Sequence, residues 1–219
     1  MTSGNVQSSR GVTLVGGGAP RAEDIKLLRG YAPDLVAADG GANFCAAEGL
    51  SPVAVIGDFD SLAPETKEKL TKSHFIHVAE QDSTDFYKCL TNIQAPFILA
   101  TGFTAKRLDH TLAALSTLVQ IQTCPVILLG EEDVIFAAPK RLELPLPAGQ
   151  RLSLFPMAPV KGRSTGLKWA IDGLELSPNG RIGTSNETLG PVTLEFEAGG
   201  CLVILPRTML EVALMALTG

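Results

Sequence analysis

Residues 54–61 read AVIGDFDS, an apolar run typical of a buried strand that ends in two carboxylates, Asp58 and Asp60. One interpretation is local, because Asp between a strand and a helix commonly caps backbone N–H groups. Here Asp60 or Ser61 would cap a helix that begins near Pro64. The other interpretation is chemical, since paired carboxylates bind metal ions that hold phosphates. The motif alone favours the cap, so the rest of the chain has to decide.

On both sides of this stretch, up to about residue 130, short apolar runs alternate with segments of helical spacing. The runs cover residues 12–17, 34–40, 53–58, 75–80, 96–102 and 125–130. Strands that alternate with helices predict an α/β N-terminal domain with a mostly parallel Rossmann-like sheet. After about residue 140, short alternating runs broken by Pro, Gly and Asn predict an all-β sandwich C-terminal domain. We therefore expect a disordered lead over 1–10 and two domains, over 11–138 and 139–219.

Composition and charge narrow the class of protein. The net charge of −5 comes without a basic stripe or alternating aromatic and basic residues, which argues against a nucleic-acid partner. No run approaches the roughly 20 apolar residues that span a bilayer, so we expect no membrane partner. The four cysteines are far apart and form no C-x-x-C pair, which is typical of reduced thiols. These features predict a soluble, cytoplasmic protein.

Polar residues follow the predicted strands at their carboxyl ends, where loops converge and ligands bind in parallel sheets. Asp follows four of these strands. The groups are, in chain order, Asp39 with Gly40 and Gly41, Asp58 with Asp60, Gln81–Asp85 (QDSTD), and Asp109 after Arg107. Each has an ordinary structural alternative, such as a favourable helix dipole for Asp85 or a solvated ion pair for Lys88. A GGG turn at 16–18 is equally compatible with a phosphate cradle and with an ordinary turn.

Convergence of these carboxylates is the stronger argument. Two carboxylates about 4 Å apart repel by roughly 4 kcal/mol at an effective dielectric constant near 20. If Asp58, Asp60, Asp85 and Asp109 meet, a hard cation such as Mg²⁺ offsets this repulsion and binds substrate phosphates. The sequence lacks the G-x-x-x-x-G-K-[ST] motif, which excludes a P-loop. The residues therefore predict a Mg-nucleotide phosphoryl-type transferase.

Six blocks together carry a resemblance to a known family. They are DGGAN (39–43), GDFDS (57–61), QDSTDFYKCL (81–90), RLDHTLAAL (107–115), GLKW (166–169) and TSNE (184–187). In this order, over nearly the whole chain, they resemble the thiamine pyrophosphokinase (thiamine diphosphokinase) family. The resemblance implies a nucleotide-binding catalytic domain over 11–138 and a thiamine-binding and dimerisation domain over 139–219. It further implies Mg-dependent transfer of the diphosphate of ATP to the hydroxyl of thiamine, in a homodimer whose site is shared between protomers.

The resemblance also implies residue roles. Asp58, Asp60, Asp85 and Asp109 form the catalytic acidic group, in which Asp58, Asp60 and Asp85 bind Mg²⁺. ATP and its phosphates are contacted by Asp39, Gly40, Gly41, Gln81, Thr84, Lys88 and Arg107, and thiamine by Trp169, Ser185 and Asn186. Without the family, sandwich core is the better interpretation of Trp169. Asp85 and Asp109 are both candidates for the proton acceptor, and His110 has no assigned role. The alternatives are a kinase or pyrophosphokinase for another small alcohol, and a non-catalytic nucleotide- or thiamine-binding module.

Overall fold

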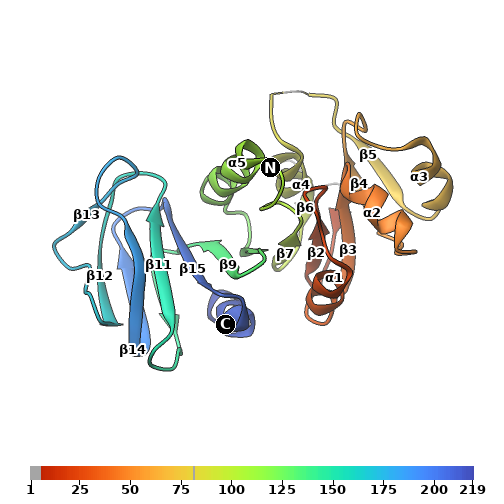
Figure 1. The fold of residues 1–219 in the computed structure, drawn as a ribbon. Helices are drawn as coiled ribbons and strands as arrows, with labels where there is room; N and C mark the ends of the chain where they lie inside the picture. The colour runs from red at the N-terminus through yellow and green to blue at the C-terminus, as the bar shows by residue number, and fades with distance from the viewer. Residues whose placement is uncertain (1–5, 81) are drawn as a thin grey trace. The chain divides into compact units, whose positions relative to one another are not determined.

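The computed structural model describes residues 6–80 and 82–219, and these form two compact units (Figure 1). The first unit runs to Thr117 and includes Ile121–Gly130, whereas the second comprises Leu118–Gln120 and Glu131–Gly219. The units are defined by contacts alone. The functional domains expected over 11–138 and 139–219 stay a prediction.

Six parallel strands form the sheet of the first unit, within the described residues. Each of the six apolar runs provides one strand, which confirms those element predictions. The strands are β2 (Val12–Val15), β3 (Asp34–Ala38), β4 (Ala54–Gly57), β5 (His74–His77), β7 (Ile98–Thr101) and β8 (Val126–Leu129). They pair in the order β5–β4–β3–β2–β7–β8. All residues of β2, β4, β7 and β8 are buried, as expected for parallel strands with helices on both faces.

In the part of the chain that the structure describes, five helices cover this sheet. They are α1 (Ala22–Arg29), α2 (Gly41–Ala47), α3 (Pro64–Lys69), α4 (Asp85–Asn92) and α5 (Leu108–Gln120). Because crossovers between parallel strands are right-handed, α1, α2 and α3 lie on one face, and α4 and α5 lie on the other (Figure 1). The buried side chains of Val15, Ile25, Leu35, Cys45 and Val55 form part of the core under the first face.

The predicted disordered lead is partly structured. Strand β1 (Val6–Gln7) pairs in parallel with β6 (Ile93–Gln94), and Val6 is buried. The remaining residues of the predicted lead, 1–5, lie outside the described residues.

The strands of the second unit are antiparallel. They are β9 (Asp133–Ala137), β10 (Arg141–Leu144), β11 (Arg151–Pro156), β12 (Val160–Leu167), β13 (Glu175–Leu176), β14 (Gly183–Phe196) and β15 (Cys201–Pro206). They pair in the order β9–β15–β11–β14–β12–β13, and β10 also pairs with β14. The pairing of β12 with β14 shifts register at Gly166, which has a φ of +77° and where a Cβ atom would lie 2.0 Å from the Pro191 carbonyl oxygen. Glycine is therefore required at this bulge.

The predicted fold class is wrong. The chain was expected to combine a mostly parallel Rossmann-like sheet with an all-β sandwich, but its strands are mixed in direction and only 25% of the chain is helical. In the first unit, β3, β4 and β5, which directly follow β2 in the chain, lie on one side of it, and β7 and β8 lie on the other. The Rossmann order instead has only the next two strands on that first side and the last three on the other. The second unit is not all-β, because the short 3₁₀ turn Arg207–Met209 and helix α6 (Leu210–Thr218) follow β15. Local periodicity identifies strands, but it does not encode their order.

Among the described residues, none of the helices has both the length and the apolar composition needed to cross a bilayer.

Candidate active site

The carboxylates of Asp58 and Asp60 belong to a cluster that also contains Asp39. One carboxylate oxygen from each lies within 4.8 Å of the others. Asp39 follows β3, the other two follow β4, and these strands are neighbours with Ala38 opposite Ile56. Neither Asp60 nor Ser61 caps α3, because its N-cap is Ala63, which makes no side-chain capping bond in the described structure. The geometry therefore favours the chemical interpretation of the DFD motif.

Asp39 is the buried member of this cluster, with 1% of its surface exposed. Its Oδ2 accepts a hydrogen bond from the Ser61 backbone N–H at 3.2 Å, whereas its Oδ1 is buried without a partner among the described residues. Burial raises the pKa of this carboxyl, and the charges of Asp58 and Asp60 raise it further. Asp39 and Phe59 have φ values of 29° and 68°, and such strain concentrates at functional sites. A buried oxygen without a donor, beside two more carboxylates, fits a divalent cation.

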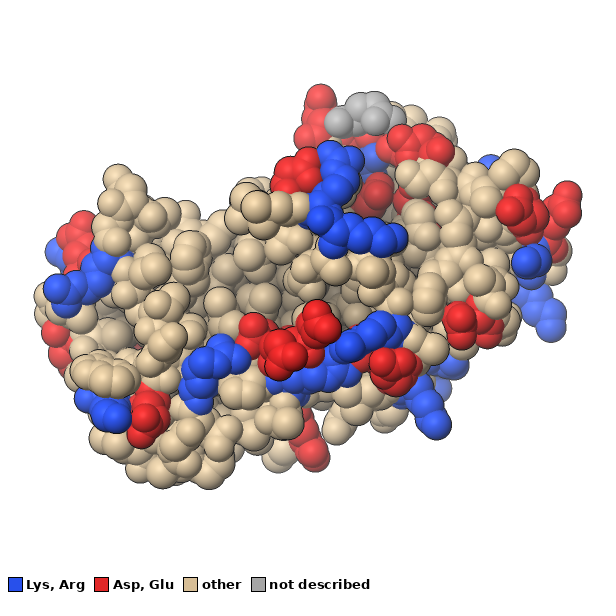
Figure 2. All heavy atoms as spheres, viewed as in Figure 1, with Lys and Arg blue, Asp and Glu red and all other residues tan. Residues whose placement is uncertain are grey.

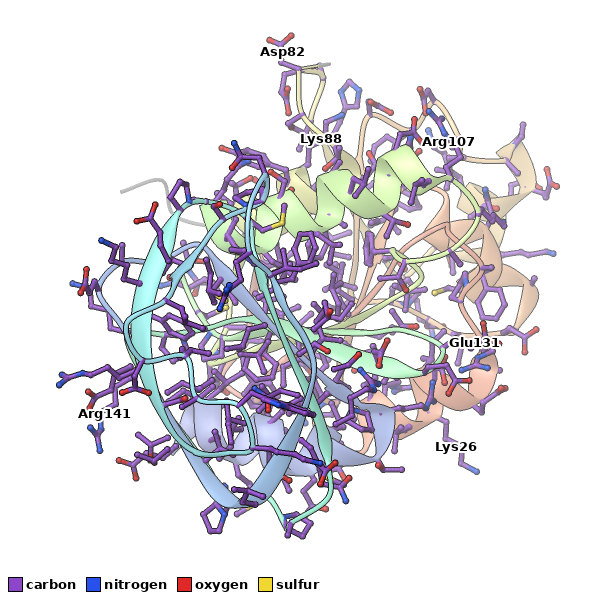
Figure 3. The ribbon with its side chains drawn as sticks, turned by 60° about the vertical axis from the view of Figure 1, so that its left-hand side comes forward. Lys26, Asp82, Lys88, Arg107, Glu131 and Arg141 are labelled. Carbon is purple, nitrogen blue, oxygen red and sulfur yellow. The ribbon has the colours of Figure 1, made fainter. Side chains whose placement is uncertain are left out.

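Lys88 neutralises part of this acidic cluster. Its Nζ lies 2.7 Å from Asp58 Oδ2, and only 2% of its side chain is exposed. The hydrogen bond from Lys88 lowers the pKa of Asp58. Burial alone would lower the pKa of Lys88, but the bond to Asp58 and the negative charges of Asp58, Asp85 and Glu80 together raise it. In Figure 3, Lys88 lies at the base of the loop that carries Asp82 at its tip. Its described partner is thus a carboxylate, and its contact with ATP phosphate stays a prediction.

Helix α4 begins directly after Thr84. Thr84 is the N-cap, and its side chain accepts a hydrogen bond from the Tyr87 backbone N–H at 3.3 Å. Asp85 therefore occupies the first helical position. Burial raises the pKa of Asp85 to about 6, and the negative charge of Asp39 adds to the shift.

A cavity of about 250 Å³ lies next to the acidic cluster within the first unit. Asp85 lines it together with three of the predicted ATP-binding residues, Gly40, Thr84 and Arg107. The other lining residues are Gly17, Gly18, Ala38, Ser61, Phe86, Gly102, Phe103, Ala105, Lys106, His110 and Ala114. Gly41 packs under β2 instead, where a Cβ atom would lie 2.1 Å from the Val15 carbonyl oxygen. Gln81, also predicted to contact ATP, lies outside the described residues.

Asp109 does not join the acidic cluster in the described structure. It pairs with Arg107 at 2.5 Å at the start of α5, and the side chains are 64% and 68% exposed respectively. The hydrogen bond from Arg107 holds the pKa of Asp109 below its ordinary value. Figure 3 shows Arg107 at the end of this helix, and Figure 2 shows basic and acidic side chains interspersed on the face drawn. Two residues in one helical turn thus neutralise each other.

Sequence reasoning missed several residues around the cavity. Phe103 packs against Phe86 with ring centroids 4.6 Å apart, and Lys106 Nζ lies 3.3 Å from the Gly17 carbonyl oxygen. Lys106 also has a φ of 67°, a strained value for a lysine. In the sequence, only the GGG run at 16–18 pointed to this side of the cavity, which Gly17, Gly18, Phe103 and Lys106 line. The fold is needed to bring residues 103–106 to it.

The predicted thiamine residues meet in the second unit. The Trp169 backbone N–H donates to Asn186 Oδ1 at 3.2 Å, and Asn186 Nδ2 donates to the Trp169 carbonyl oxygen at 2.7 Å. Ser185, with a φ of 60°, donates its backbone N–H to Ser153 Oγ at 2.9 Å. Trp169 is 56% exposed, and Lys168 Nζ lies 5.0 Å from its ring centroid. The indole is therefore presented at the surface of this unit, contrary to the sandwich-core interpretation.

We expect the Asp85→Asn variant to be more stable than the wild-type protein in metal-free buffer at pH 7.5, by roughly 1 to 2 kcal/mol after allowance for partial exposure. The folded pKa of about 6 exceeds the unfolded value near 3.8. Ionisation therefore costs folding free energy, and this cost develops between about pH 4 and pH 6 and is full above pH 6. Urea denaturation in EDTA at pH 7.5 and pH 4 measures the difference, which should shrink at the lower pH. Equal stability at pH 7.5 contradicts a buried, repelled carboxylate.

Two protein-family models match the chain, one largely within the first unit and one within the second. The family model "Thiamin pyrophosphokinase, catalytic domain" matches residues 26–128, and "Thiamin pyrophosphokinase, vitamin B1 binding domain" matches residues 139–201. Thiamine pyrophosphokinase 1 of Oryza sativa subsp. japonica is 30% identical over 155 residues, which cover 62% of this chain and 58% of the relative. Thiamine pyrophosphokinase 2 of Arabidopsis thaliana is 28% identical over 199 residues, 73% of each chain. This chain thus spans less than two thirds of the rice relative's length.

Solved structures resemble the chain over more of its length. The thiamin pyrophosphokinase from Candida albicans has a TM-score of 0.74 and 17% identity, over 92% of this chain and 93% of that chain. At this identity the likeness concerns the fold alone. The likeness supports a β-rich fold of the kind found in this thiamin pyrophosphokinase and not a Rossmann-like parallel domain. It agrees with the finding that the predicted fold class is wrong.

Proposed function

The chain belongs to the thiamine pyrophosphokinase family, and from this premise we propose that it is a thiamine diphosphokinase. It transfers the β,γ-diphosphate of ATP to the hydroxyl of thiamine and yields thiamine diphosphate and AMP. The observation that carries this proposal is the cluster of Asp39, Asp58 and Asp60 beside a cavity, within the part of the chain that the catalytic-domain model matches. Such a cluster is costly without a cation and suits a phosphate-bound one.

We propose that Mg²⁺ is held by Asp58 and Asp60, with the unpartnered Oδ1 of Asp39 facing the same ion. The fit rests on three carboxylates within 4.8 Å and on that buried oxygen. When bound, Mg²⁺ would neutralise the phosphate oxygens of ATP. That Asp85 also binds the ion stays a prediction.

In the proposed reaction the hydroxyl oxygen of thiamine forms a bond to the β-phosphorus of ATP. The bond from this phosphorus to the oxygen that bridges to the α-phosphate breaks, and AMP leaves with that oxygen. The hydroxyl proton needs an acceptor, and between the two candidates we assign it to Asp85. Its pKa is raised to about 6 and it lines the cavity, whereas the pKa of Asp109 is lowered by its bond with Arg107. A carboxylate with the higher pKa is the better base.

We propose that thiamine binds at Trp169, Ser185 and Asn186, where an exposed indole face suits a cationic thiazolium ring. The ATP candidates lie in the first unit and these residues in the second. We therefore propose a homodimer in which the second unit of one protomer completes the site of its partner. Large exposed apolar side chains, which include Leu108 and Leu112, support association. A cytoplasmic location is supported by four free cysteines.

Incubation of the purified protein with Mg-ATP and thiamine tests the function. The expected products are AMP and thiamine diphosphate in equal amounts, resolved by chromatography. ADP with thiamine monophosphate, or turnover only with another alcohol, indicates a different kinase. Saturable binding of thiamine without turnover indicates a non-catalytic module. Either result contradicts the proposal.

A further inference from the structure

Hydrogen bonds of the Asn43 side chain tie the loop that carries Asp58 and Asp60 to helix α2. Asn43 Nδ2 donates a hydrogen bond to the Ser61 carbonyl oxygen at 2.7 Å. Asn43 Oδ1 accepts two more, from the Ala63 backbone N–H at 2.9 Å and from the Thr66 hydroxyl at 2.7 Å. A single amide thus uses its donor and its acceptor to hold both the end of the loop and the first turn of α3.

Ser61 passes this restraint to the carboxylates. Its backbone N–H donates to Asp39 Oδ2 at 3.2 Å, and its hydroxyl donates to Asp60 Oδ1 at 2.9 Å. The Asp60 backbone N–H in turn donates to Asp58 Oδ1 at 3.3 Å. The Ser61 carbonyl, which Asn43 holds, is therefore within two peptide units of the groups that orient all three members of the acidic cluster.

Backbone strain and carboxylate repulsion both act to open the loop of Asp58 and Asp60, so the loop needs hydrogen bonds to hold it. Phe59, between the two loop aspartates, has a φ of 68°, a conformation that costs free energy for a residue with a side chain. The carboxylates also repel one another, so the loop would open without restraint. Lys88 offsets the charge of Asp58, while Asp60 is exposed and has Ser61 as its side-chain partner. Asn43 is well placed to keep Asp60 in the cluster.

We propose that Asn43 is a positioning residue that sets the carboxylates of Asp58 and Asp60 for a divalent cation before the cation binds. This inference rests on the proposed metal site, and it adds a residue that touches neither the metal nor the substrates. It acts through hydrogen bonds of the kind that orient metal ligands, whose removal commonly lowers metal affinity by 10- to 100-fold.

The test measures Mn²⁺ binding to the full chain by electron paramagnetic resonance, after treatment with EDTA and its removal. Asn43→Ala is expected to weaken Mn²⁺ binding about tenfold and to raise the Mg²⁺ concentration for half-maximal turnover by the same factor, with the KM for thiamine unchanged. Thr66→Val, which removes one of the bonds to Asn43 Oδ1, is expected to weaken binding about threefold. Because both variants act through the same amide, their effects should not add in the double variant.

Ser73→Ala is the matched control. It removes a hydrogen bond from the Ser73 hydroxyl to the Pro52 carbonyl oxygen, 2.6 Å, at the opposite end of the strands from Asp58. It should leave Mn²⁺ affinity unchanged. Mn²⁺ affinities within twofold of wild type in folded Asn43→Ala overturn the inference; if that variant does not fold, Thr66→Val decides by the same criterion. Wild-type protein that binds Mn²⁺ but forms no thiamine diphosphate defeats the proposed function, and the affinity comparison still tests Asn43.

Discussion

Asp60→Asn is expected to lower kcat/KM for thiamine by about 100- to 1,000-fold, the range for loss of one preorganised electrostatic group. The amide has nearly the shape of the carboxylate and still accepts the 2.9 Å hydrogen bond from the Ser61 hydroxyl. It loses the charge that the proposed site uses to bind Mg²⁺. Since Asp60 is exposed and pairs with no lysine or arginine among the described residues, the free energy of unfolding should not fall, and relief of carboxylate repulsion should raise it slightly. Steady-state kinetics and urea denaturation measure the two quantities.

Asp58→Asn is compared with Asp60→Asn, because the same chemical change is made at a residue that is paired with a buried lysine. Turnover should fall as far, but the protein should also lose roughly 1 to 3 kcal/mol of stability. The acidic cluster alone predicts the reverse, since one less carboxylate relieves repulsion. The decisive neighbour is Lys88, which is 2% exposed and would lose its charged partner at 2.7 Å.

Either of two results would remove the metal-site proposal. One is near-wild-type turnover in Asp60→Asn, which would leave the loop aspartates a local structural role only. The other is an inactive Asp60→Asn protein that proves to be unfolded. Mg²⁺ titration of both variants adds a second check, because a lost ligand should raise the Mg²⁺ concentration for half-maximal turnover.

Mixing Asp60→Asn protomers with Trp169→Ala protomers is expected to restore about a quarter of wild-type activity if the site is shared across a two-fold axis. Random exchange makes half of the dimers mixed. In each mixed dimer both lesions fall in one site, and the other site is wild type. Trp169→Ala alone should raise the KM for thiamine about tenfold through loss of a cation–π face. The assay therefore uses thiamine well below the KM of the wild-type protein, where this variant alone has little activity.

Subunit exchange must be shown to be complete for this experiment, for example by native mass spectrometry of differently tagged protomers. With exchange complete, a mixture no more active than the average of its parents excludes the shared site. Mixing two preparations of Asp60→Asn is the control, since no combination of them contains a wild-type site. Sedimentation of a monomer at assay concentration would remove the dimer itself.

The sequence by itself determined the six strands of the parallel sheet in the first unit and the kind of chemistry at their carboxyl ends. Each of the six apolar runs became a strand, because strands buried on both faces must be apolar along their whole length. Asp39, Asp58 and Asp85 each follow a strand, and that placement is legible as local pattern. The family blocks were equally local, so membership of the thiamine pyrophosphokinase family could be recognised from them.

Only the tertiary structure decided which of these residues meet. The pairing of β3 with β4 brings Asp39 beside Asp58 and Asp60, and strand order is a property of long-range contacts that no local period encodes. For the same reason the predicted Rossmann-like fold class was wrong although its strands were correct. Asp109 forms an ion pair with Arg107 in its own helical turn. Asp58 instead pairs with the buried Lys88, thirty positions away in the chain. Which carboxylate keeps a cation and which is neutralised depends on burial and distance, and both arise only when the chain is folded.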